Sequence, residues 1–115
     1  MTEVTRLTVQ DSTRNKVIAS GEVDSDAIIY EGSYYFDEGL VDMTNLNVTE
    51  RVFRCPYKGV SYWIDLVGQS GNSIKDVAWV FPEPNPGYEQ IAGRIAFYPG
   101  VRRGTTASLT RETGD

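Results

Sequence analysis

The sequence predicts a small, mainly β protein: a compact antiparallel sandwich or open barrel of seven or eight strands, with one short helical turn. Apolar residues alternate at a period of two, aromatic and β-branched residues crowd the same segments, and turns rich in Gly or Pro separate them. The length of 115 residues is that of one domain. We therefore expect a single domain over residues 1–103, followed by a polar, Thr-rich tail at 104–115 that frays.

The clearest expected element is a hairpin in the middle of the chain. Residues 60–67 carry Val, Tyr, Ile and Leu at every second position, which predicts a half-buried strand. Residues 77–81 are apolar on both faces, like a central strand. The turn formers at 68–73 connect the two. Further strands are expected at residues 6–10, 17–19, 27–30, 52–55 and 94–98.

Only one helical piece is expected. Three prolines at alternate positions between residues 82 and 86 block regular structure and stiffen the loop along a polyproline-like path. Residues 88–92 after them can form a single helical turn, which Gly93 ends. A stiff loop of this kind suits a structural wall or the rim of a pocket.

Composition excludes several kinds of site. The chain has no His and one Cys, so it has no disulfide of its own, no Ser-His-Asp or Cys-His catalytic set and no His- or multi-Cys zinc site. A net charge of −5 argues against nucleic acid as a partner. Without an apolar run of about 20 residues or a hydrophobic leader, we expect no membrane contact and a cytoplasmic location.

Charge is divided unevenly along the chain. Residues 17–50 hold eight acidic side chains and no Lys or Arg, whereas residues 51–103 hold seven basic and four acidic side chains. A solvated acidic face is the favoured interpretation, and a partner-binding face is the alternative. The two halves would attract each other within one fold or across a homodimer.

The densest segment is 55–63. Pro56 ends a strand and leaves Cys55 beside a loop that holds Lys58, whose ammonium would favour the reactive thiolate. Cys55 is therefore a weak candidate nucleophile. We favour the interpretation that it is a small buried hydrophobe, because no His or second Cys is available as its base or resolving thiol.

Aromatic side chains form a second candidate site. Tyr62, Trp63, Trp79 and Tyr98 could stack on a base or sugar, although aromatic residues at strand spacing are more often core. Trp63 and Trp79 should lie within a few residues of being opposite across the hairpin. The geometry of that hairpin also brings Lys58 near Pro82 and Pro84, at the mouth of whatever cavity the indoles wall.

A third segment, residues 33–42, begins with an aromatic run and is rich in acids. Asp37, Glu38 and Asp42 have the carboxylates that a divalent cation prefers. A surface turn between strands predicts the same residues, and we favour it. No metal site and no cofactor are therefore predicted.

Several of these motifs occur together in one order. They are Tyr34-Tyr35-Phe36, Cys55-Pro56-Tyr57-Lys58-Gly59, Tyr62-Trp63, Ala78-Trp79 with Pro82 and Pro84, and Ile91-Ala92-Gly93 with Ala96-Phe97-Tyr98. In this order the chain resembles, over about residues 17–99, the family called domain of unknown function 427, sometimes labelled a nucleotidyltransferase family. The resemblance implies a small, mostly β domain of the beta-tent kind.

The resemblance also implies a set of signature residues without a known biochemical role: Cys55, Lys58, Gly59, Tyr62, Trp63, Trp79, Pro82 and Pro84. Relatives of beta-tent architecture often hold zinc between Cys pairs, which one Cys cannot do. Nucleotidyl transfer usually shows a Gly-Ser followed by an Asp-x-Asp pair. Here Gly32-Ser33 and Asp42 are present, but Thr44 stands at the second Asp position, so a two-metal site would lack a ligand.

The favoured function is a binding module for a small anionic or nucleotide-like ligand, at a pocket formed by Lys58, Tyr62, Trp63, Trp79, Pro82 and Pro84. Two alternatives stay open. One is an enzyme that uses Cys55 or a carboxylate-bound metal, including the nucleotidyltransferase idea. The other is a protein–protein interaction domain that uses its acidic face.

Overall fold

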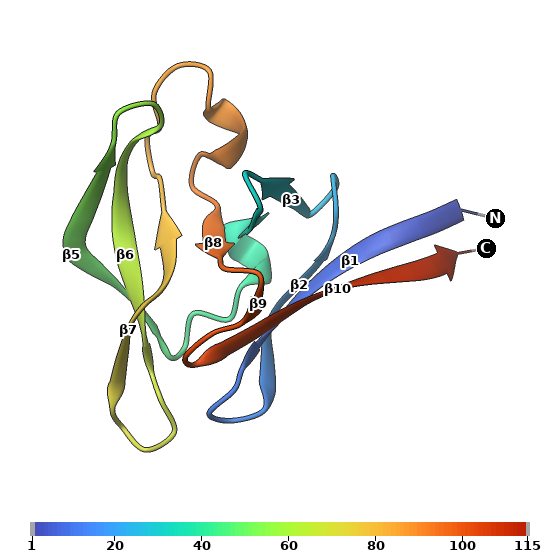
Figure 1. Ribbon diagram of the computed structural model, residues 1–115, viewed down its shortest axis with the longest axis horizontal. Coiled ribbons are helices and arrows are strands. Elements are labelled where there is room, and N and C mark those ends of the chain that lie inside the picture. The colour runs from blue at the N-terminus through green and yellow to red at the C-terminus, as the bar shows by residue number, and fades with distance from the viewer. Residues whose placement is uncertain (1, 115) are drawn as a thin grey trace.

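The computed structural model describes residues 2–114, and most of them lie in strands (Figure 1). Ten strands form two antiparallel sheets. The smaller sheet has the order β2 (Lys16–Glu22), β1 (Thr2–Asp11), β10 (Thr105–Gly114), β9 (Gly100–Val101). The larger has the order β3 (Ala27–Tyr30), β4 (Ser33–Phe36), β8 (Ile95–Phe97), β7 (Ser73–Val80), β6 (Gly59–Val67), β5 (Leu46–Cys55). Both described sheets have open edges, so neither closes into a barrel.

The main core lies between the two sheets. Alternating residues of each strand turn inward, as the strand period requires, and they include the fully buried Leu7 and Val9 of β1 and Ile64 and Leu66 of β6. Phe36 and Phe97 meet edge to face at 5.9 Å in this layer. The mainly β class predicted from the sequence is confirmed.

A second, smaller core lies on the other face of the larger sheet. Its buried members are Tyr35, Phe81, Ile91 and Ala96. Trp79, Tyr88 and Cys55 pack against them while remaining partly exposed. Because the larger sheet therefore buries residues on both faces, its middle strands are apolar on both faces, as residues 77–81 indicated.

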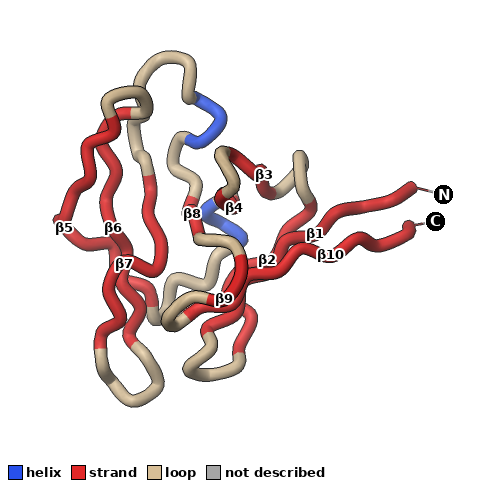
Figure 2. The backbone as a smooth tube through the Cα atoms, in the orientation of Figure 1, coloured by secondary structure: helices blue, strands red, loops and turns tan. Residues whose placement is uncertain are grey.

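The predicted hairpin and helical turn are both present. β6 and β7 pair in antiparallel register around a turn closed by a hydrogen bond from the Gly68 N–H to the Asn72 carbonyl. The helical turn is η2 (Glu89–Ile91), and a second such turn, η1 (Glu38–Leu40), was not predicted. These two 3₁₀ turns are the helical pieces of the described chain (Figure 2).

The structure corrects the expected frayed tail. Residues 105–114 form β10, which pairs with β1 along its whole length, from Asp11↔Thr105 to Thr2↔Gly114. Figure 1 shows the two strands side by side as far as the chain ends. Thr favours extended backbone, and the ladder satisfies the backbone groups that a free tail would leave to water. Asp115 lies outside the described residues.

The number of strands is also larger than the predicted seven or eight. The segment 33–36, expected to be part of a surface turn, is strand β4 in the sheet interior, between β3 and β8. Three of its residues are buried, with Tyr34 and Phe36 in the main core and Tyr35 in the second. Its aromatic run has no polar alternation because both faces of this strand are covered.

Candidate functional site

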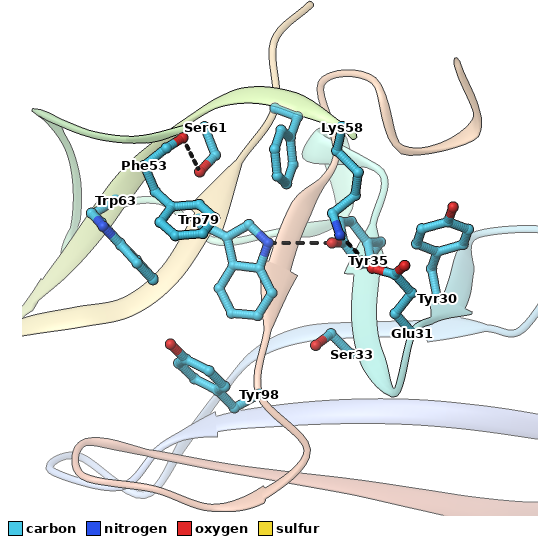
Figure 3. Close-up of a pocket in the computed structure, with 11 residues that line it drawn as sticks. Tyr30, Glu31, Ser33, Tyr35, Phe53, Lys58, Ser61, Trp63, Trp79 and Tyr98 are labelled. Atoms are coloured by element: carbon cyan, nitrogen blue, oxygen red, sulfur yellow. Dashed lines mark hydrogen bonds and ion pairs between the residues drawn. The ribbon is translucent and has the colours of Figure 1, made fainter. Parts of the chain in front are cut away.

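A hollow of about 280 Å³ opens on the face of the larger sheet that carries the second core (Figure 3). It is lined by Tyr30, Glu31, Ser33, Tyr35, Phe53, Lys58, Ser61, Trp63, Trp79, Phe81 and Tyr98. We call it the aromatic pocket. β4, β5, β6 and β7 supply its floor, and the turns before β4 and before β6 supply its charged residues.

Contacts between aromatic rings build the walls. Trp63 and Trp79 are direct partners in the β6–β7 register, with ring centroids 6.1 Å apart, so they form the predicted cross-strand pair. Trp79 also lies 4.8 Å from Tyr98 and 6.2 Å from Tyr35. On the far side, Phe53 of β5 lies 6.2 Å from Trp63. Trp79 is thus the ring that the others surround.

A small residue makes room for this arrangement. Ala96 of β8 pairs with Tyr35 on one side and Trp79 on the other, and it is fully buried. The two large side chains meet above its methyl group, where the indole N–H of Trp79 donates to the Tyr35 hydroxyl at 3.3 Å. Burial raises the pKa of the Tyr35 hydroxyl, so it stays protonated and remains a donor near neutral pH.

Lys58 lies at one end of the pocket in an ion pair with Glu31. The Lys58 side chain is 17% exposed and that of Glu31 is 57% exposed, so the lysine is the inner partner. Burial alone would lower the pKa of the Lys58 ammonium, but the hydrogen bond to Glu31 helps to raise it above its ordinary value. Lys58 is therefore fully charged at neutral pH.

The loop after β7 holds the turn from which Lys58 extends. The backbone N–H of Asn85 donates to the Lys58 carbonyl at 2.8 Å, and the Asn85 side-chain amide donates to the Tyr57 carbonyl at 3.1 Å. Gly59 has φ +107°, and Asn85 fills the space that a side chain at residue 59 would need. The expected proximity of Lys58 to the proline-rich loop therefore exists, and Asn85 makes the contact.

Cys55 does not line the aromatic pocket, but it contacts the backbone of Lys58, which does. Its sulfur accepts the backbone N–H of Lys58 at 3.3 Å. That hydrogen bond lowers the pKa of the thiol below its ordinary value, although burial opposes the shift. The side chain is only partly buried and packs against the second core. Its environment is therefore intermediate between the two expected from the sequence, a reactive thiolate beside the loop and a fully buried hydrophobe.

The structure does not bring all of the predicted site residues together. Lys58, Trp63 and Trp79 line the aromatic pocket. Tyr62 faces the main core, because neighbours on a strand point to opposite faces, and with Pro82 it borders another hollow. Pro84 borders neither hollow.

Sequence reasoning missed seven of the pocket residues: Tyr30, Glu31, Ser33, Tyr35, Phe53, Ser61 and Phe81. Both Tyr35 and Phe53 are aromatic, but Tyr35 falls in the segment 33–42 that we expect to be a surface turn, and Phe53 falls in the expected strand 52–55 with no sign of the pocket. Glu31 has no local signal at all, because its partner Lys58 is 27 positions away.

The three carboxylates considered for a metal do not converge. Asp37 accepts the N–H of Gly39 and starts η1. Asp42 accepts both the N–H and the hydroxyl of Thr44 and pairs with Lys16 at 2.9 Å. Among residues 2–114, no group of three Cys, Asp or Glu side chains is placed to hold a metal ion.

A family model described as "Domain of unknown function (DUF427)" matches residues 4–108. The chain belongs to this family. The match extends past both ends of the resemblance noted over residues 17–99 and includes every residue that lines the aromatic pocket of this DUF427 domain. No curated protein matches the chain. Within the described residues, none of the helical pieces has the length and apolar character needed to cross a membrane.

Proposed function

We propose that this DUF427 domain is a binding module for a small ligand that combines a flat ring with an acidic group. The observation that carries the proposal is the charged Lys58 ammonium at the end of a pocket walled by two indoles and a phenol. Small-molecule sites are typically concave and mostly apolar, with a few polar groups that fix orientation.

The walls favour a flat group. The ring of Trp79 lies among Trp63, Tyr98 and Tyr35. A planar heterocycle gains stacking and edge-to-face contacts there, and these contacts do not require hydrogen bonds to particular atoms of its ring. Lys58 would bind the acidic group. An ammonium has three N–H donors, and Glu31 is its one acceptor among the described residues.

The pocket volume limits the size of the ligand. About 280 Å³ is just below the range of roughly 300–1,000 Å³ that is usual for drug-sized ligands. A single ring system with a short acidic arm, or the base of a mononucleotide with its phosphate at the mouth, fits that size. A nucleic acid strand does not suit a chain with net charge −5.

Thermal denaturation with indole-3-acetate and with adenosine monophosphate tests the proposal. Ligand at about one hundred times its Kd stabilises the native state by about 2.7 kcal/mol. We therefore expect at least one of these probes to raise the Tm by several degrees. Lys58→Met should abolish the rise, whereas Lys75→Met, which removes a lysine from the exposed surface of β7, should retain it. If neither probe raises the Tm at millimolar concentration, and L-tryptophan does not raise it either, the proposal is wrong.

A further inference from the structure

The pocket presents a cation and an anion side by side, and this deepens the proposal above, on which it rests. Within the described residues, Lys58 pairs through one ammonium donor with Oε1 of Glu31, and no donor is placed on Oε2 of Glu31. Two ammonium donors and one carboxylate oxygen thus remain for a ligand. In Figure 3 both charged groups lie on the side of Trp79 where its indole N–H meets Tyr35.

Glu31 is held in place by an unusual backbone. The connection from β3 to β4 is a two-residue turn in which Tyr30 pairs with Ser33. Glu31 has φ +50° and Gly32 has φ +81°, the positive values that a tight hairpin of this type requires at both central positions. Asn, Asp or Gly occupies such positions more readily than Glu. A long acidic side chain at this strained position is explained if its carboxylate serves the pocket.

The paired charges change what the pocket selects. An acid that lacks a basic group is attracted by Lys58 and repelled by the adjacent Glu31. A base that lacks an acidic group is attracted by Glu31 and repelled by Lys58. A ligand with both groups on one short arm satisfies both partners, and complementary charge placement of this kind gives specificity rather than raw affinity.

We propose that the ligand is a zwitterionic α-amino acid with a flat side chain. Its ring lies among Trp79, Trp63 and Tyr98. Its carboxylate accepts from Lys58, and its ammonium donates to Glu31. The acidic group of the proposed function is then the α-carboxylate, and the basic group beside it is the α-ammonium.

Four probes that share the tryptophan skeleton and differ in their charged groups test this inference by isothermal titration calorimetry at pH 7. L-tryptophan has both charges, N-acetyl-L-tryptophan keeps the carboxylate, L-tryptophan amide keeps the ammonium, and N-acetyl-L-tryptophan amide has neither. We expect L-tryptophan to bind most tightly. The Kd of each single-charge probe should be higher by a factor of about ten or more, because each probe loses one charge-assisted hydrogen bond. The amide probe also represents the first residue of a peptide, so equal binding of L-tryptophan and its amide would indicate a peptide N-terminus and overturn the inference.

Two variants add a result that unfolding cannot imitate. Glu31→Gln keeps the length of the side chain and should weaken L-tryptophan while strengthening N-acetyl-L-tryptophan. Lys58→Met should weaken L-tryptophan while strengthening L-tryptophan amide. Glu38→Gln, which removes an exposed acid outside the pocket, should change none of these affinities.

The outcomes separate this inference from the proposed function. Binding of indole-3-acetate or adenosine monophosphate without a preference for L-tryptophan over N-acetyl-L-tryptophan would retain the binding module and reject the amino acid. Failure of all six compounds to bind would reject both. Selective binding of L-tryptophan with the expected exchange of preference in the two variants would support both.

Discussion

The backbone N–H of Asn85 donates to the carbonyl oxygen of Lys58 at 2.8 Å. This bond joins the proline-rich loop after β7 to the turn between β5 and β6, and the Asn85 side chain adds a second bond to Tyr57. The stiff loop thereby fixes the start of the Lys58 side chain at the end of the pocket. Asn85 and Gly59 are positioning residues for the lysine, since neither lines the aromatic pocket.

Gly59→Ala should disturb this joint. A Cβ at residue 59 would lie 3.2 Å from Oδ1 and 3.4 Å from the backbone nitrogen of Asn85, on a backbone with φ +107°. We expect a loss of unfolding free energy of about 1–3 kcal/mol and weaker binding of indole-3-acetate. Urea denaturation and calorimetry measure the two effects.

Gly71→Ala is the matched control for that variant. Gly71 also has a positive φ, +90°, but a Cβ at this residue would meet nothing within 4 Å, and the glycine is remote from Lys58 in the β6–β7 turn. The variant should lose stability through backbone strain alone and keep its affinity. Equal affinities in the two variants would show that the contact with Asn85 does not position Lys58.

Ala96→Val should separate Tyr35 from Trp79. Ala96 is fully buried directly between these two residues in the sheet register, below their 3.3 Å hydrogen bond. Two additional methyl groups overfill this space, so we expect a loss of about 1–3 kcal/mol in unfolding free energy and a clear loss of ligand affinity. Ala78→Val overfills the opposite, core-facing side of β7. It should lower stability without changing the ligand affinity, measured under conditions in which the variant is fully folded. Equal affinity losses in both variants would contradict a specific role for the Tyr35–Trp79 pair.

Local pattern was sufficient for the hairpin but not for the whole pocket. The period of two in β6 and the apolar run in β7 predict Trp63 and Trp79 within a few residues of being opposite, and the folded sheet makes them direct partners. β10 carries no such pattern, and its partner β1 lies about a hundred positions earlier, so only the folded ladder reveals it. The Lys58–Glu31 pair is non-local in the same sense, and it joins the basic and acidic halves of the chain within one fold.

The sequence motifs did not indicate how their residues are grouped in space. Tyr62 and Trp63 are adjacent in one motif, yet strand alternation sends Tyr62 to the main core and Trp63 to the pocket. Tyr35 was not predicted as a pocket residue, because the acids after its aromatic run indicate a surface turn. A cytoplasmic location, the absence of a cofactor and homodimer formation stay predictions.

Asp11→Asn should reduce both the unfolding free energy and the dependence of that free energy on pH in the acid range. The Asp11 side chain is fully buried, and it accepts the N–H and hydroxyl of Thr13 and pairs with Arg14 at 2.7 Å. Burial alone would raise the pKa of this carboxyl, but these hydrogen bonds together lower it below its ordinary value. At pH 7 the variant should lose roughly 1–3 kcal/mol of unfolding free energy, because Arg14 loses its charged partner.

The sign of the pH effect follows from the lowered pKa. The folded carboxyl binds its proton less readily than the unfolded one, so its stabilising contribution is complete above the unfolded pKa of about 4 and is lost as the pH falls through the folded pKa. Urea denaturation of the wild type should therefore show stability falling below about pH 4, and Asp11→Asn should fall less steeply there. Glu50→Gln, an exposed acid on β5, should keep the wild-type slope. An equally steep acid limb in Asp11→Asn would show that Asp65 and Asp42, whose pKa values are lowered by Arg51 and by Thr44, dominate acid unfolding instead.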